Sequence, residues 1–248
     1  FDLSFEFKDY NTPYLYNTFS TPPIAFRETT SVLSSRNLHT IDFSNEYGYL
    51  LELNRTFENS LNLLISYSFA LHHQEGISDH NIFSSDDILD FRDYWPYKQF
   101  YIEFSKLSMD GKSYYRLGYD YYHEVTDLKT ILAKTIPMQF AYNFKTGNSL
   151  TLYFEIQDKI EEVTSVEHKY MYFTPTYNHF GKWTFSLFLD YEEDDEIIYG
   201  TDYTVNYNSS QISFFLGSQK GGLVCANGSC VMQPDFTDGL KVTYRTTL

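Results

Sequence analysis

Apolar and polar residues alternate one by one along most of this chain. In the stretch LNLLISYSFALH, residues 61–72, the odd positions carry Leu, Ile, Tyr and Phe, while the even positions are mostly small or polar. The same period of two recurs in SYYRLGYDYYHE (113–124), SLTLYFEIQ (149–157) and GLKVTYRTTL (239–248). Because successive side chains of a strand point to opposite faces, the pattern predicts β-strands with one apolar and one polar face.

The chain is therefore expected to be all-β and to hold about twelve such strands. Many of them reach about 10–13 residues, whereas strands of globular proteins usually have about five or six. A tilted strand that crosses a bilayer needs about 9–11 residues. The expected strands are 1–8, 46–57, 61–73, 97–109, 113–125, 131–144, 149–159, 169–179, 183–191, 197–207, 211–220 and 239–248.

The connections between these strands alternate in length. Tight turns are expected at 57–60, 110–112, 145–148, 181–182 and 208–210. The other connections are mostly longer and include 9–45, 74–96, 126–130, 160–168, 192–196 and the segment around 222–236. Short turns at one end and longer loops at the other are typical of an up-and-down antiparallel transmembrane β-barrel. We predict one such barrel domain over residues 1–248.

Alternation alone does not identify a membrane protein, because a soluble β-sandwich alternates as well. Strand length and the systematic difference between the two sets of connections favour the barrel over a sandwich or a β-solenoid. Aromatic residues make up 19% of the chain, and Tyr and Trp often lie near predicted strand ends, as at Trp95, Tyr177 and Trp183. Aromatic girdles of this kind occur where a barrel meets the membrane interface.

The composition narrows the possible partners. The formal net charge of −15 argues against nucleic acid as a partner. No apolar stretch approaches the roughly 18 residues of a membrane-spanning helix, and the mean hydropathy is negative. The sequence opens inside an alternating run, FDLSFEF, without a basic and apolar leader stretch, so we expect a signal peptide to be absent or already removed. We expect the chain to be the C-terminal part of a longer protein, with further strands between Phe1 and Leu248 in the closed barrel.

Two cysteines, Cys225 and Cys230, flank Asn227-Gly228, which is the strongest two-residue hairpin signal. A type I′ turn there places the cysteines opposite each other at a non-hydrogen-bonded pair, with Cα atoms about 4.5 Å apart. We predict a disulfide, which implies an oxidising compartment, with free buried thiols as the alternative. In an up-and-down barrel this hairpin would lie on the long-loop side, as a clasp on an exposed tip.

The C-terminal stretch GSQKGGLVCANGSCVMQPDFTDGLKVTYRTTL resembles the end of outer-membrane β-barrel proteins of Bacteroidota in a family of unknown function. The upstream stretch STPPIAFRETTSVLSSRN is similar to a loop of that family. The resemblance implies an outer-membrane barrel and no characterised activity. The chain departs from the usual pattern at Leu248, where such barrels end in an aromatic residue. The matching positions are Gly221, Val224, Cys225, Gly228, Cys230, Pro234, Gly239 and 240–248.

Charged residues on the polar faces of the predicted strands are the candidate site. Opposite charges among them could pair across neighbouring strands, and they could form the selectivity lining of a pore. The alternative is a filled, salt-bridged interior, which bulky residues on the same faces, such as Tyr101, Tyr122 and Phe215, favour. The predicted lumen charges are Glu46, Glu52, Glu103, Arg116, Asp120, Glu155, Asp190, Asp202, Lys241 and Arg245.

Two kinds of cluster suggest metal binding only weakly. The stretch HHQEGISDH, residues 72–80, holds three histidines, but His72 and His73 would point to opposite faces of a strand. The loops SSDDILD (84–90) and YEEDDEI (191–197) are rich in carboxylates, which calcium prefers, yet neither has EF-hand spacing. We predict no metal and no cofactor.

Catalysis at the rim of the barrel is the least favoured function. His123 and Glu124 lie near the predicted rim, with Asp120 further along the same strand, but no nucleophile motif accompanies them. We predict a non-enzymatic barrel that is a structural or partner-binding subunit of an outer-membrane assembly. Its expected partners are outer-membrane lipids and other outer-membrane, periplasmic or surface proteins. The alternative is a pore or channel for small or hydrophobic solutes.

Overall fold

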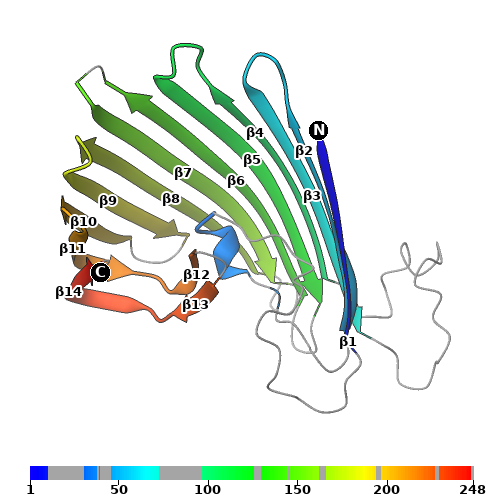
Figure 1. Cartoon of the computed structure of the whole chain (residues 1–248). Helices are drawn as coiled ribbons and strands as arrows, with labels where there is room; N and C mark the ends of the chain where they lie inside the picture. Colours follow the sequence, from blue (N-terminus) through cyan, green and yellow to red (C-terminus); the bar gives the residue numbers. More distant parts are fainter. Residues whose placement is uncertain are drawn as a thin grey trace.

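The computed structural model describes residues 1–10, 31–37, 39, 46–72, 97–125, 130–144, 146–161, 166–193, 197–226 and 229–246. Twelve strands form one antiparallel sheet in the order β1-β2-β3-β4-β5-β6-β7-β8-β9-β10-β11-β14. The predicted all-β, up-and-down architecture is confirmed, and the sheet curves into a wall with one concave and one convex face (Figure 1). The strands are β1 (Asp2–Tyr10), β2 (Glu46–Thr56), β3 (Leu61–His72), β4 (Tyr97–Leu107), β5 (Ser113–Val125), β6 (Thr130–Asn143), β7 (Asn148–Glu161), β8 (Val166–His179), β9 (Trp183–Glu192), β10 (Ile198–Tyr207), β11 (Ser210–Gln219) and β14 (Phe236–Thr246).

The remaining elements are short. Strands β12 (Gly222–Ala226) and β13 (Ser229–Gln233) form a separate two-stranded hairpin between β11 and β14 in the chain. A 3₁₀ turn, η1 (Ser34–Arg36), lies on the concave side of the sheet (Figure 1). Among the described residues, no helix is long and apolar enough to cross a membrane.

The sheet does not close on itself. β1 pairs only with β2 and β14 only with β11, so these two strands are its edges within the described residues. The expected barrel would bring β1 and β14 either against each other or against further strands between them. The structure has no β1–β14 ladder, and the expectation of further strands stays a prediction.

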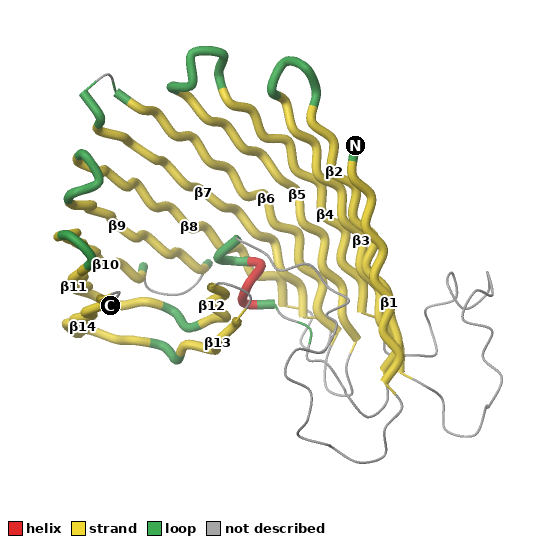
Figure 2. The backbone as a smooth tube through the Cα atoms, in the orientation of Figure 1, coloured by secondary structure: helices red, strands yellow, loops and turns green. Residues whose placement is uncertain are grey.

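Tight turns gather at one end of the strands, as the sequence predicts (Figure 2). The turn between β2 and β3 is closed by the bond from the Phe57 amide to the Leu61 carbonyl, 2.8 Å long. The turn between β4 and β5 is closed in the same way by the Ser108 amide and the Ser113 carbonyl, also at 2.8 Å. Gly111 has φ +68° in this second turn, where a residue with a Cβ would be strained.

The two faces of the sheet show the reverse of a soluble protein's burial pattern. On the concave face polar side chains are enclosed: Ser68 and Glu155 are each 0% exposed. On the convex face large apolar side chains are open, with Leu117 50% and Leu216 60% exposed. Register confirms the assignment, since Leu117 pairs with Met138 on one face while Asp120 pairs with Thr135 on the other. The apolar half of the alternation therefore faces outward.

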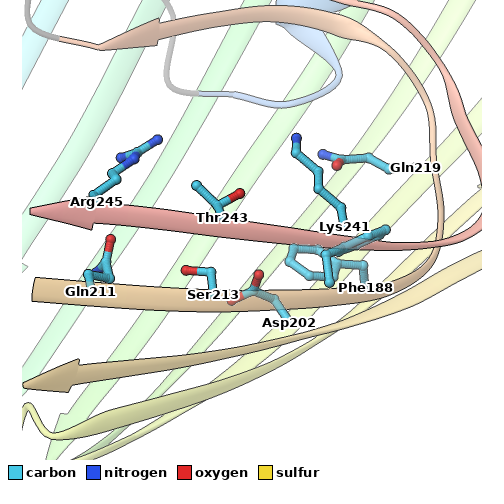
Figure 3. Close-up of a pocket in the computed structure, with 9 residues that line it drawn as sticks. Phe188, Asp202, Gln211, Ser213, Gln219, Lys241, Thr243 and Arg245 are labelled. Carbon is cyan, nitrogen blue, oxygen red and sulfur yellow. The ribbon is translucent and has the colours of Figure 1, made fainter.

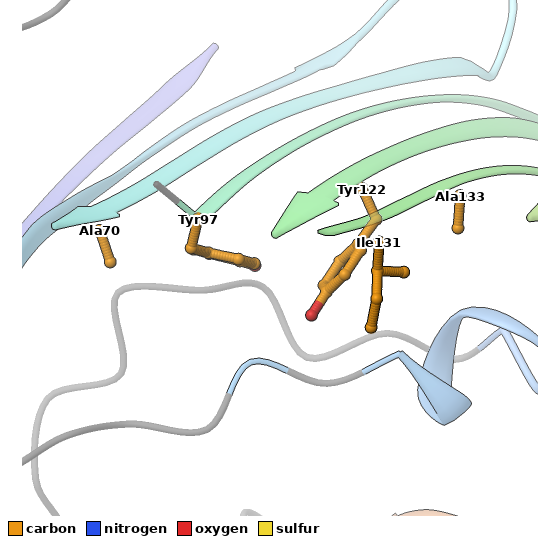
Figure 4. Packing of buried hydrophobic residues seen from close by; sticks show 5 residues of the cluster. All are labelled: Ala70, Tyr97, Tyr122, Ile131 and Ala133. Carbon is orange, nitrogen blue, oxygen red and sulfur yellow. The ribbon is translucent and has the colours of Figure 1, made fainter. Parts of the chain in front are cut away.

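Buried apolar residues form two small clusters, one on each face, and no single central core. On the concave side, Tyr97 and Tyr122 pack edge to face with ring centroids 5.6 Å apart, and their side chains point toward the side of η1 (Figure 4). On the convex side, Tyr47, Phe69 and Leu71 pack together. The concave cluster comprises Ala70, Tyr97, Tyr122, Ile131 and Ala133.

Pro137 lies in β6, a central strand, although proline cannot donate a ladder hydrogen bond. The pairing between β5 and β6 skips from Leu117–Met138 to Asp120–Thr135, so the ladder is interrupted beside the proline. Gly118 faces the gap, where an added Cβ would lie 3.0 Å from the proline ring and 2.9 Å from the Tyr101 hydroxyl. A glycine on the neighbouring strand thus makes room for the ring.

Candidate functional site

The segment 31–37 lies against the concave face of the sheet and carries η1 (Figure 1). It belongs to the connection between β1 and β2, for which the sequence predicted only a long loop. The Ser31 carbonyl accepts from the Ser35 amide at 3.1 Å, and the Ser31 hydroxyl oxygen accepts from the Ser34 amide at 3.1 Å. Leu33 is completely buried. These two hydrogen bonds to Ser31 hold the short stretch in a turn that buries the Leu33 side chain.

The side chain of Glu155, at the middle of β7, binds backbone amides of this turn. Its two carboxylate oxygens accept from the amides of Val32 and Leu33 at 2.8 and 2.7 Å, and the Tyr153 hydroxyl donates to it as well. A fully buried carboxylate is costly unless it is hydrogen-bonded, and these donors satisfy both oxygens. Glu155, predicted as a lumen charge, is therefore an anchor for the inward segment.

Arg36 makes a second anchor on β9. Its Nη1 donates to Oδ1 of Asp190 at 3.2 Å, and its Nη2 donates to Oδ2 of the same carboxylate. Such a pair with two N–H donors fixes orientation as well as distance. The turn thereby spans from β7 to β9 across the concave face.

His39 makes a third anchor, at the long-loop end of β2 and β5. Its Nδ1 lies 2.7 Å from a Glu124 oxygen and its Nε2 lies 3.0 Å from a Glu46 oxygen. The ring stacks on Tyr97 with centroids 4.3 Å apart. Burial lowers the pKa of His39, but hydrogen bonds and charges from Glu124 and Glu46 outweigh that effect and raise the pKa above its usual value. Lys8 of β1 pairs with the same Glu46.

We call residues 31–37 and His39 the inward segment. Its anchors are separated from their partners by up to 154 residues in the chain, as for Arg36 and Asp190. The sequence analysis missed Lys8, His39 and Glu124 as members of this network. A local signal was the apolar pair Val32-Leu33 among serines in SVLSSRN, which indicates a turn with apolar side chains to bury.

The other predicted lumen charges also lie on the concave face, where neutral groups hold several of them. Gln99 donates to both Asp120 oxygens at 3.0 and 3.1 Å. The Tyr101 hydroxyl donates to Glu103, and the Arg116 guanidinium lies 5.6 Å from the centroid of the Tyr153 ring. Glu52 is half-buried on the same face. An ion pair across neighbouring strands does occur, but between Lys8 and Glu46.

The far side of the concave face holds a cavity of about 280 Å³ between β9, β10, β11 and β14 (Figure 3). Lys241 and Arg245 of β14 and Asp202 of β10 line it, so three of the predicted lumen charges meet here. Asp202 accepts a hydrogen bond from the Thr204 hydroxyl at 2.9 Å. The floor includes Phe188 and Phe215, whose ring centroids are 5.9 Å apart.

The cysteine hairpin has the predicted backbone register. Cys225 pairs with Cys230 and Ala226 with Ser229. The disulfide itself stays a prediction, because the side chains of β12 and β13 lie outside the described part. β12 lies against η1, so the base of the hairpin borders the inward segment, and the exposure of the hairpin tip stays a prediction (Figure 1).

In the part of the chain that the structure describes, no group of three or more His, Cys, Asp or Glu residues is arranged to hold a metal ion. The stretch 73–80 and the acidic loop 84–90 lie outside the described residues. The rim residues considered for catalysis lie on different faces of β5: Glu124 and Asp120 face the concave side, and His123 lies on the opposite face.

Comparison with known proteins gives a family and no function. No curated protein and no solved structure matches the chain. Residues 5–248 match a family of unknown function, DUF6029, which covers nearly the whole sequence. The chain, with its twelve-stranded sheet and its inward segment, therefore belongs to the DUF6029 family.

Proposed function

We propose that this protein is a non-enzymatic outer-membrane β-barrel wall, of the kind the sequence suggested for Bacteroidota, that acts as a structural or partner-binding subunit. The reversed burial pattern supports a membrane setting. Leu3, Leu117 and Leu240 are 59%, 50% and 63% exposed on the convex face, while the concave face encloses charged groups. An apolar surface spread over many neighbouring strands is stable only against an apolar surrounding, and lipid is the surrounding that long strands fit.

One observation favours a structural role over a channel: the inward segment is tied to the concave face at Glu155, Asp190, Glu46 and Glu124. These anchors join it to four strands, β2, β5, β7 and β9. A conducting pore needs an open polar path, and here the polar groups are engaged with a piece of the chain itself. This arrangement favours an occluded interior.

The edge strands β1 and β14 support the partner-binding part of the proposal. Each has one neighbour in the described sheet, so the backbone groups along its other side have no ladder partner there. In hydrocarbon such groups must be paired. Strands that add to these edges would complete the wall.

A channel is the second candidate, and the cavity at Lys241 and Arg245 is the observation that favours it. In this part of the concave face charged side chains are exposed, as pore-lining residues would be. A solute could enter there without displacing the inward segment.

Single-channel recording in planar lipid bilayers tests the choice. We expect no steady current from the wild-type protein and a measurable current from a variant that lacks residues 31–37. A Glu52→Gln variant, altered on the same face at a residue with no contact to the inward segment, is the matched control and should stay silent. A steady ion current through the wild type would overturn the occluded interior. Fractionation of cells that express the protein tests the location, and recovery outside the outer membrane would contradict it.

A further inference from the structure

The cavity between β9 and β14 has the chemistry of a ligand site. We propose that it binds a small organic anion, a carboxylate or phosphate monoester attached to an apolar group. The cavity volume of about 280 Å³ is near the lower end of the usual range for small-molecule sites, roughly 300–1,000 Å³. The inference concerns a binding function and does not depend on whether the wall conducts ions.

The charge of this cavity is unusual for the molecule. The chain carries 33 acidic and 18 basic residues, and the enclosed part of the concave face is dominated by carboxylates such as Glu46, Asp120 and Glu155. At β14 two cations, Lys241 and Arg245, enter one cavity with one carboxylate, Asp202. Neither cation is paired with a carboxylate among the described residues, and both side chains are exposed to the cavity (Figure 3). An anion would supply the missing partner.

Strand register arranges the lining from a polar to an aromatic end. Arg245 lies opposite Gln211, Thr243 opposite Ser213, and Lys241 opposite Phe215. Lys241 and Arg245 are four residues apart on the same face of a strand, roughly 13 Å between Cα atoms. A charged group held near Lys241, on the side toward Arg245, would therefore leave its apolar substituent beside Phe215 and Phe188.

The hydroxyl and amide groups in the middle of the cavity are suited to orient such a ligand. Ser213 shares a hydrogen bond with the Thr204 hydroxyl at 2.7 Å, and Gln211 donates to Asn206 at 3.0 Å. These contacts hold the side chains in place from the β10 side. Asp202 repels an anion, so removing its charge should raise the affinity for the anion, whereas removing either cation should lower it.

Isothermal titration of the folded protein in detergent micelles with phenyl phosphate and with 3-phenylpropionate tests the proposal. We expect saturable binding of at least one probe with a dissociation constant near or below about 1 mM. Lys241→Gln with Arg245→Gln should weaken it by about tenfold or more, because hydrogen bonds to charged groups are the strong ones. Asp202→Asn should strengthen it severalfold.

Lys106→Gln with Lys112→Gln is the matched control, because it removes two positive charges at the end of β4 and the turn after it, several strands away from the cavity, and should leave the affinity unchanged. Phenol, which has the ring without the charge, should bind much more weakly than phenyl phosphate. Absence of saturable binding of both probes would overturn the proposal. Equal affinities in wild type and the Lys241/Arg245 variant would overturn it as well, and a loss of affinity for the anionic probes in Asp202→Asn would contradict the proposed charge arrangement of the cavity.

Discussion

Two regions of one concave face behave differently, although the same alternating pattern builds both. In the covered region, from β2 to β7, polar side chains such as Ser68 and Glu155 are fully enclosed and tied to other parts of the chain. In the open region, at β10, β11 and β14, Lys241 and Arg245 stand exposed around a cavity. The inward segment is anchored to the covered region, and its anchors on the sheet reach as far as Asp190 of β9. A polar strand face becomes a structural anchor or a binding surface according to what lies against it.

The largest expected effect comes from placing the same charge on the concave face of each region. Ser68→Arg should cost about 3–5 kcal/mol, because the site is completely enclosed, so the larger side chain overpacks it and the new charge loses its hydration. Thr243→Arg, in the open region, should change stability by about 0.5 kcal/mol or less. Urea unfolding in detergent micelles measures both, and equal costs would remove the distinction between the regions.

The convex face should show no such difference. Leu117→Arg on β5 and Leu216→Arg on β11 should each cost about 2–4 kcal/mol if the convex face contacts lipid near the bilayer midplane. Unfolding in lipid vesicles is the appropriate measurement. A negligible cost at both positions would show that the apolar face does not lie in lipid.

The anchor on β7 should contribute less than a lipid-facing residue. Glu155→Gln removes the charge from the hydrogen bonds to the amides of Val32 and Leu33, and we expect a loss of about 1.5–3 kcal/mol. Limited proteolysis should cut the inward segment faster in this variant. Asp202→Asn, which makes the same kind of change in the open region, should leave that cleavage rate unaltered; a faster rate there would contradict the assignment.

A smaller effect should follow pH through His39. The folded-state pKa of His39 lies above its unfolded value, so its pairing with Glu124 and Glu46 stabilises the inward segment fully at low pH and is lost as pH rises through the folded pKa. Cleavage of the inward segment should therefore accelerate severalfold above neutral pH. The His39→Gln variant should show a flat profile, and a wild-type profile that is also flat would exclude this role.

The smallest effect should come from the hairpin. Cys225 and Cys230 should resist alkylation until reduced, and Cys225→Ala should leave the sheet folded with a loss of about 2 kcal/mol at most, since the closed loop is short. Thermal unfolding and alkylation followed by mass spectrometry check both points. Loss of the folded sheet in Cys225→Ala would mean that the clasp is needed for folding.

Local alternation was enough to predict most of the architecture. The predicted strands 61–73, 113–125 and 149–159 correspond to β3 (Leu61–His72), β5 (Ser113–Val125) and β7 (Asn148–Glu161). The faces followed as well, because side-chain direction in a strand depends only on the parity of the residue number. The hairpin register at Cys225 and Cys230 was also predictable from local sequence, because the turn residues Asn227-Gly228 specify it.

Tertiary structure alone decided what the polar face does. Parity places Ser68, Glu155 and Lys241 on one face and does not distinguish them, yet two of them are fully buried and one is exposed. The inward segment reaches Glu155 across 122 residues and Asp190 across 154, and the curvature of the sheet determines which strands such a segment can touch. No local pattern encodes a contact of that range, because it depends on how twelve strands pair and bend together.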